Sequence, residues 1–272
     1  MMKKIRPWLE QLAKRFPALR KNTLSAAAGI LPVLLPCAAV LFLLCFIEAL
    51  GSRYEWLKGT GEFWALVEGI LVMPLAAGMI TYAASAVWEH RSASLNDAAQ
   101  LVRIRIKPVL ITGVAAGAIM LLLRWVSSVV GSVVGILPAL TGWIPLVGPA
   151  ISGIAGFVLW LLALALAFVA HAAMVSGMLA LTADGMSGKP QLERAIGIVW
   201  EGRSETLPEL GTVFGVWIIL EALAGALGLI PGMIGALAGS LVSAALYVLS
   251  MTAVSVVYLT ARDRKDGMRF HS

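Results

Sequence analysis

The stretch that decides the fold runs from Trp125 to Ala183 and reads WVSSVVGSVVGILPALTGWIPLVGPAISGIAGFVLWLLALALAFVAHAAMVSGMLALTA. Its 59 residues contain no Asp, Glu, Lys or Arg, and His171 is the one residue able to titrate. A helix needs about 20 apolar residues to cross the hydrocarbon core of a bilayer. A soluble core helix of this length without an amphipathic pattern would be unusual. The stretch therefore predicts a membrane protein.

Two further uncharged runs, Thr23 to Ile47 and Ala222 to Ala261, extend this interpretation to the whole chain. Only 13% of the 272 residues are charged, against roughly 25% in an ordinary soluble domain. The sequence predicts an all-α bundle of six membrane spans, at about 23–50, 63–87, 108–134, 151–182, 209–229 and 233–260. The connection at 131–153 is rich in Gly and Pro, and it is either a re-entrant segment or, as we favour, a turn in the outer interface.

The basic residues predict which way the spans point. Eighteen of the 21 Lys and Arg residues fall before the first span, between the second and third, between the fourth and fifth, and after the sixth. Cationic segments stay in the cytoplasm during insertion. Both termini are therefore expected to be cytoplasmic. The apolar run of 25 residues after the N-terminal cations exceeds the roughly 7–15 of a signal peptide, so we expect an uncleaved first span.

The predicted organisation is a basic amphipathic helix at 1–22, a six-span domain at 23–260 and a cytoplasmic tail at 261–272. The spans form three hairpins, and a short amphipathic segment precedes each one. Such segments either lie in the headgroup layer or pack against the cytoplasmic ends of the bundle. A Gly-x-x-Pro sequence recurs at 29–32, 135–138 and 228–231, which suggests repeated hairpin units.

Ionisable side chains within the spans are the candidates for a binding or coupling site, because burying them in a membrane is costly. These candidates are Glu221, His171, Arg124, Glu68 and Glu48. Glu221 is expected near the middle of the membrane, as a proton-carrying or headgroup-binding carboxylate or as a protonated structural residue. Arg124 is expected to pair with Glu48 or Glu68 near the outer surface.

The sequence contains no motif for enzymatic, metal or cofactor chemistry. The three histidines are scattered, and Cys37 and Cys45, eight residues apart on one predicted helix, are interpreted as packing residues. Gly185-Met186-Ser187-Gly188 spells the Gly-x-Ser-Gly of intramembrane serine proteases, but it lies in a polar connection without a catalytic base. We therefore expect a protein that is not an enzyme and that has no metal or other cofactor.

The end of the last predicted span is more distinctive. Residues 258–267 read Tyr-x-x-x-Arg-x-Arg-Lys-Asp-Gly. This ending resembles that of a broad group of uncharacterised bacterial six-helix membrane proteins, which is similar to the membrane domain of some glycerophosphodiester phosphodiesterases. The resemblance implies a bacterial inner-membrane location and the six-helix architecture. It implies no catalysis, because the phosphodiesterase barrel is absent from this sequence.

Three functions follow from these features. The first is a permease-like or lipid-handling transport component, favoured by the hairpin repeat and Glu221. The second is a non-catalytic scaffold or assembly factor that binds anionic lipid or a protein partner at its cytoplasmic face. A lipid-processing enzyme is a minor alternative, and nucleic-acid binding is not expected. The residues expected to contact lipid headgroups or a partner are Arg103, Arg105, Lys107, Arg262, Arg264 and Lys265.

Overall fold

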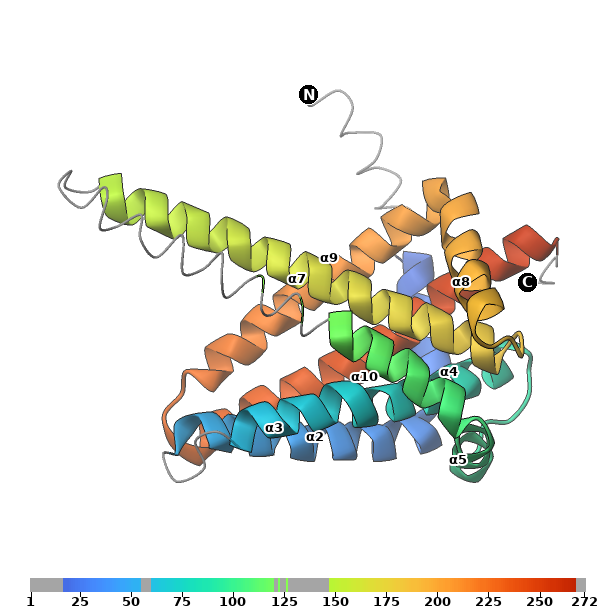
Figure 1. Cartoon of the computed structure of the whole chain (residues 1–272), viewed down its shortest axis with the longest axis horizontal. Coiled ribbons are helices and arrows are strands. Elements are labelled where there is room, and N and C mark those ends of the chain that lie inside the picture. The colour runs from blue at the N-terminus through green and yellow to red at the C-terminus, as the bar shows by residue number, and fades with distance from the viewer. Residues whose placement is uncertain (1–16, 55–59, 120–121, 123–125, 127–146, 268–272) are drawn as a thin grey trace.

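The computed structural model describes residues 17–54, 60–119, 122, 126 and 147–267, and this part of the chain is helical without strands. The expected all-α class is therefore confirmed. The helices are a first helix at 17–29, α2 (Leu31–Arg53), α3 (Thr60–Val67), the π-helical segment η2 (Glu68–Val72), α4 (Met73–Trp88), α5 (Leu95–Ile104), an unlabelled helix (Ile106–Ile119), α7 (Val147–Thr182), α8 (Lys189–Glu201), α9 (Arg203–Gly228) and α10 (Gly232–Asp266) (Figure 1).

Five of the described helices are long and apolar enough to cross a membrane: Leu31–Gly51, Glu68–Trp88, Gly153–Thr182, Arg203–Gly228 and Gly232–Asp266. They correspond to the predicted first, second, fourth, fifth and sixth spans. Of the predicted third span, the structure describes the apolar helix Ile106–Ile119 and little beyond it. Residues 131–146 of the Gly/Pro-rich connection lie outside the described residues, and its end, from Val147, already belongs to α7.

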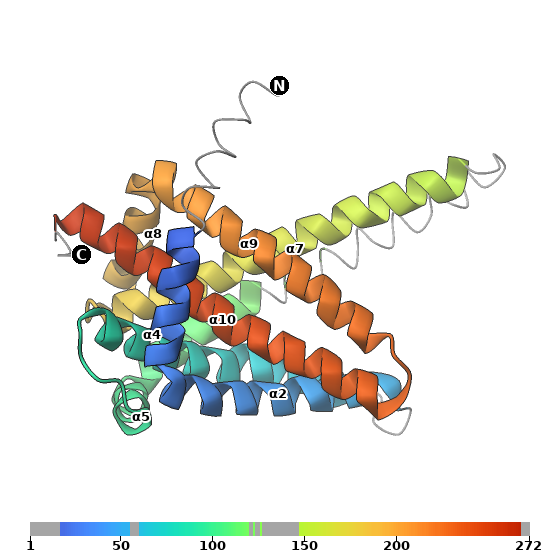
Figure 2. The ribbon, with the colours of Figure 1, turned by 180° about the vertical axis from the view of Figure 1, so that it is seen from behind.

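The first predicted span, 23–50, is interrupted near its N-terminal end. A helix at 17–29 ends at Ile30, and α2 begins at Leu31 with Pro32 in its first turn. Pro32 has no N–H to donate to the preceding turn, so the chain changes direction here. Figure 2 shows the first helix running at a steep angle to α2. The Gly-x-x-Pro sequence at 29–32 thus breaks a helix, whereas the one at 228–231 forms the turn between α9 and α10.

α10 is the central helix, and it packs against α2, α4, α7, α8 and α9. Its sequence contains many small residues and several Ser and Thr residues, most of which are buried. The hydroxyls of Ser250, Thr252 and Ser255 each donate to a backbone carbonyl three or four residues earlier, over 2.7–2.9 Å. Because these three donors are satisfied within the helix, their burial leaves no unpaired hydroxyl, whereas the buried hydroxyl of Ser240, also on α10, has no partner among the described residues.

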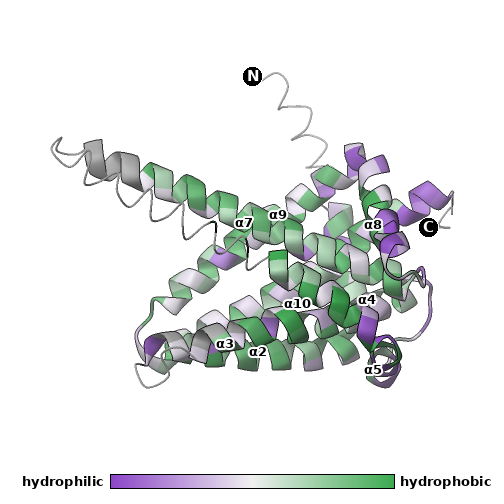
Figure 3. Cartoon of the chain, viewed as in Figure 1, coloured by the Kyte–Doolittle hydropathy of each residue, from purple (hydrophilic) through white to green (hydrophobic). Residues whose placement is uncertain are grey.

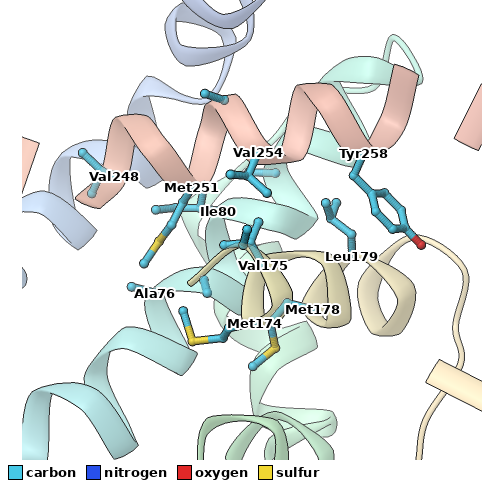
Figure 4. Close-up of a cluster of buried hydrophobic side chains, with 14 of the residues drawn as sticks. Ala76, Ile80, Met174, Val175, Met178, Leu179, Val248, Met251, Val254 and Tyr258 are labelled. Atoms are coloured by element: carbon cyan, nitrogen blue, oxygen red, sulfur yellow. The ribbon is translucent and has the colours of Figure 1, made fainter. Parts of the chain in front are cut away.

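The core lies where α4, α7 and α10 meet (Figure 4). Ile80, Val175, Met178 and Met251 are completely buried there. Tyr258 is also buried, with its ring in the core and its hydroxyl directed toward the segment that follows α7 (Figure 4). The amphipathic character of Tyr suits this position at the edge of the core.

Two glycines let the helix Ile106–Ile119 approach the second span closely. A Cβ on Gly113 would collide with the ring of Pro74, and one on Gly117 would lie 2.9 Å from Cγ1 of Ile70. Neither position leaves room for a larger residue without a shift of its neighbour, so the two glycines, four residues apart, serve this helix contact.

The polar residues of the described chain gather at one end of the bundle. Figure 3 shows hydrophilic residues concentrated on α5, α8 and the last turns of α10. α5 and α8 are the short amphipathic helices predicted before the third and fifth spans, and the corresponding segment before the first span lies largely outside the described residues. The N-cap Ser94 starts α5 by accepting a hydrogen bond from the N–H of Asp97.

The last helix is longer than predicted. The sequence predicts a span that ends at residue 260 and a tail from 261, but α10 continues to Asp266 and ends at Gly267 in the left-handed conformation (φ 69°). Gly is common at this position after a helix, because without a Cβ it adopts the left-handed conformation at little cost. Arg262, Arg264 and Lys265 are therefore helical residues, held in place by the ion pairs described below.

Candidate functional site

The second predicted span contains a π-helical segment, η2, which begins at Glu68. The N–H of Met73 donates to the carbonyl of Glu68, five residues earlier, as in a π-helix. Pro74, at the start of α4, has no N–H and therefore cannot make an α-helical hydrogen bond. Glu68 itself is only 7% exposed. Single π turns within α-helices occur frequently at functional sites, so this buried carboxylate is the first element of the candidate site.

Two residues of α2 face this carboxylate. The thiol of Cys45 donates to Oε1 of Glu68 over 3.6 Å. Glu48, three residues after Cys45 and therefore on the same side of α2, is close enough to Glu68 for an electrostatic interaction. Two carboxylates from different helices thus approach one another. Arg124, the predicted partner of one of them, lies outside the described residues.

Tyr247 of α10 connects these groups with the fifth span. It lies within electrostatic reach of Glu48 and Glu68 and also of Glu221 of α9. Glu221 is partly buried, less so than Glu68. The sequence predicted Glu221 as the principal candidate, whereas the structure places a more deeply buried carboxylate at Glu68.

His171 of α7 packs beside Trp217, a buried residue one helical turn from Glu221. Nε2 of His171 is 3.0 Å from the hydroxyl of Ser250. The His171 and Trp217 rings have centroids 4.8 Å apart, and those of Trp217 and Tyr247 are 5.7 Å apart. Trp217 is 4% exposed, and its indole N–H has no acceptor among the described residues.

We refer to these residues as the intramembrane cluster: Cys45, Glu48, Glu68, His171, Trp217, Glu221, Tyr247 and Ser250. They come from α2, η2, α7, α9 and α10. Within the described part of the chain, no three His, Cys, Asp or Glu side chains are grouped closely enough to hold a metal ion. Neighbouring carboxylates that share one environment do not all ionise easily, so they favour a bound proton or an organic cation.

A second polar group lies at the polar end of the bundle and centres on Asp184, just after α7. Its carboxylate binds Arg194 of α8 at 3.1 Å and Arg262 of α10 at 3.5 Å, and it accepts the hydroxyl of Tyr258 at 3.2 Å. Arg194 also binds Asp266 at 2.6 Å. Its hydrogen bonds to Asp266 and Asp184 raise the pKa of Arg194 above its ordinary value, so this residue stays charged.

The network around Asp184 continues toward α4. Arg262 also approaches Glu89 at 3.6 Å, and the indole N–H of Trp88 donates to Asp263 over 2.7 Å. The acidic members of the network are not among the site residues predicted from the sequence. The available signal was Asp184, the first charged residue after the 59-residue uncharged run.

The six cations predicted to contact lipid or a partner have different environments. Arg262 is 6% exposed and uses its charge within the chain. Arg264 binds Glu205 at 2.7 Å, Lys265 binds Glu201 at 2.9 Å, and Arg105 donates to the carbonyl of Leu181 over 2.8 Å. Arg103 and Lys107 are exposed, and no acidic partner lies within ion-pair distance among the described residues.

Comparison with protein-family models, curated proteins and solved structures finds no match to this chain. The function is therefore argued from the residues alone.

Proposed function

We propose that this chain is an integral protein of a bacterial inner membrane, with both termini cytoplasmic, and that it is a permease-like or lipid-handling transport component. Its five long apolar helices support the membrane assignment. The hydrophilic residues of α5, α8 and the last turns of α10, which belong to three of the predicted cytoplasmic segments, gather at one end of the bundle, and this supports the orientation (Figure 3).

The observation that carries the transport proposal is the position of Glu68. It is a buried carboxylate at the start of a π turn, with Cys45 as its hydrogen-bond partner and with Glu48 nearby. Buried acidic residues at an interrupted span are typical of substrate and coupling sites in transport proteins. Tyr247 extends the site to Glu221, because it lies within electrostatic reach of carboxylates from three helices, α2, η2 and α9.

The chemistry of the site favours a cationic or protonated ligand. The carboxylates supply negative charge, and the faces of Tyr247 and Trp217 attract cations. The lipid-facing sides of α7 and α9, with exposed residues such as Phe157 and Ile219, offer an apolar environment for an attached chain. We therefore expect an amphiphile with a cationic head, or a proton that drives the movement of one.

Native mass spectrometry of the full chain, extracted with its own lipids, tests this proposal. The comparison includes the unmodified protein, Glu68→Gln, Glu221→Gln and, as a matched control, Glu193→Gln. Glu193 is exposed on α8 and pairs with Lys189 at 3.3 Å. A bound amphiphile that persists in Glu193→Gln and is lost in both cluster variants supports the proposal. A ligand-free chain in every sample, or one whose ligand survives both cluster substitutions, overturns it.

A second candidate function is the scaffold, and the exposed cations of α5 favour it. Arg103 and Lys107 lie next to Ile104, which is 74% exposed. Such a surface suits anionic headgroups or an acidic protein. Arg103→Glu with Lys107→Glu should release a co-purifying partner in the same mass spectra. Arg105 is left unchanged, because its bond to Leu181 contributes to the fold.

A further inference from the structure

α8 has three faces with different environments. The first face packs on the bundle, where Gln191, Ala195 and Ile198 are buried. The side-chain amide of Gln191 donates to the carbonyl of Gly177 over 2.8 Å and to the hydroxyl of Thr112 over 3.1 Å. These contacts fix the rotation of α8 about its own axis.

The second face is charged. Glu201 pairs there with Lys265 of α10 at 2.9 Å. Lys189 and Glu193, which pair at 3.3 Å, lie beside the apolar residues described next, because Lys189 is three residues before Leu192 and Glu193 is three residues before Ile196. All these side chains reach solvent to some degree, and Lys189 is the most exposed of them. This face is suited to water.

The third face is an apolar stripe formed by Leu192, Ile196 and Trp200. These residues follow one another at four-residue spacing, so they lie along one side of the helix. Their exposed fractions are 61%, 56% and 62%. Three large apolar side chains exposed in a row mark a contact surface more often than a water-facing one.

We propose that the stripe of Leu192, Ile196 and Trp200 lies in the boundary between headgroups and acyl chains of the cytoplasmic leaflet. α8 is then an interfacial helix, with one face on the bundle, one in lipid and one in water. The proposal rests on the orientation proposed above, but it is independent of any transported ligand.

The connection to α9 supports lipid as the occupant. Only Gly202 separates α8 from α9, a helix apolar enough to span the membrane. Leu207, in the second turn of α9, is 50% exposed, and the exposed apolar residues continue along α9. The stripe is thus continuous with a face that the bilayer covers.

The charges beside the stripe also fit a lipid surface. The guanidinium of Arg203 lies 5.3 Å from the ring centroid of Trp200. Trp with an adjacent cation is typical of the headgroup level, where the ring meets the acyl boundary and the cation meets phosphate. Lys189 places a second exposed cation at the opposite end of α8. α8 lies across the ends of α7 and α10 instead of extending either one (Figure 1).

The test is carbene labelling of the unmodified full chain in phosphatidylglycerol/phosphatidylcholine vesicles that contain a phospholipid with a diazirine on its acyl chain. Adducts are located by mass spectrometry of peptides. We expect adducts on Leu192, Ile196 or Trp200, at a yield several-fold above that on Glu201, which lies on the charged side of α8. Adducts on the exposed residues Val158 and Ile219 serve as the internal standard, because they report whether α7 and α9 are in the bilayer.

Labelling of α7 and α9 without labelling of the stripe overturns the inference and leaves the membrane assignment intact. Absence of labelling on all three helices overturns both.

A spin-label experiment distinguishes lipid from a protein cover. In a variant in which alanine replaces Cys37 and Cys45, a single cysteine replaces Leu192, Ile196 or Glu201, and the collision rates of the label with oxygen and with a water-soluble nickel chelate are compared. We expect a several-fold higher oxygen-to-nickel ratio at the two stripe positions than at 201. An equal ratio, or exclusion of both reagents by a second copy or another protein, contradicts a lipid contact.

Discussion

The phenol of Tyr258 donates a hydrogen bond to Oδ2 of Asp184 over 3.2 Å, and 74 residues of sequence separate the two. The bond joins α10 to the end of α7 at the edge of the core. It explains why an aromatic residue with a polar tip occupies this position, since Phe would fill the core equally well but would leave the carboxylate short of a donor.

We expect Tyr258→Phe to lower the free energy of unfolding by about 1–2 kcal/mol, because a hydrogen bond to a charged acceptor is lost while the carboxylate of Asp184 stays largely shielded from solvent. Unfolding in mixed detergent micelles measures the change. Tyr54→Phe, at an exposed position at the end of α2, is the matched control and should be neutral. Equal stability of the two variants would show that this hydrogen bond contributes nothing.

Arg194 joins α8 to both α7 and α10 through Asp184 and Asp266. We expect Arg194→Gln to cost about 2–3 kcal/mol, because it leaves partly buried carboxylates uncompensated. Lys189→Gln should cost less than about 0.5 kcal/mol, since its pair with Glu193 is exposed. A combined Arg194→Gln and Asp266→Asn variant should lose less than the sum of the single changes, and strict additivity would argue against the pairing.

A substitution of Gly113 tests the close contact between the helix Ile106–Ile119 and the second span. We expect Gly113→Ala to destabilise the protein by about 1–3 kcal/mol, because the new Cβ meets the ring of Pro74. Gly225→Ala is the control, since nothing lies within 4 Å of its added Cβ. That substitution should be neutral or should stabilise α9 by up to about 1 kcal/mol through helix propensity. Similar melting curves for both variants would contradict the described contact.

Two substitutions of Trp217 distinguish a role of its indole N–H in the fold from a role in ligand binding. We expect Trp217→Phe to cost little stability, within about 1 kcal/mol, because the ring packing largely remains and the lost N–H has no acceptor among the described residues. Trp217→Ala should cost about 3–5 kcal/mol through the cavity it leaves. If Trp217→Phe keeps its stability but loses a bound amphiphile, the indole N–H serves the ligand. A large loss of stability in Trp217→Phe would instead assign the N–H to the fold.

Composition and charge distribution were enough to predict the helical class and most of the span positions, because a bilayer demands long uncharged segments and cations remain on one side. These are local requirements, which can be read from consecutive residues. The helix break at Gly29-Ile30-Leu31-Pro32 was visible as a Gly-x-x-Pro sequence, but its effect on direction depends on the hydrogen bonds around Ile30 and was not predicted.

The ionisable residues of the spans could also be identified in the sequence, but their ranking could not. Glu68 and Glu221 look alike as single carboxylates in apolar segments. Their different burial depends on how η2 and α9 are rotated against α2 and α10, and the π turn at Glu68 depends on local geometry before Pro74.

The sequence alone thus determined that the chain is helical, that its apolar segments are long enough to span a membrane, and that its cations cluster in four segments. The tertiary structure decided which charges meet. Arg262 is predicted from the sequence to face lipid headgroups, yet it binds Asp184, because α7 and α10 end side by side and bring residues 78 positions apart into contact. Pairing between distant residues depends on helix packing and rotation, which are properties of the assembled bundle and not of any one segment.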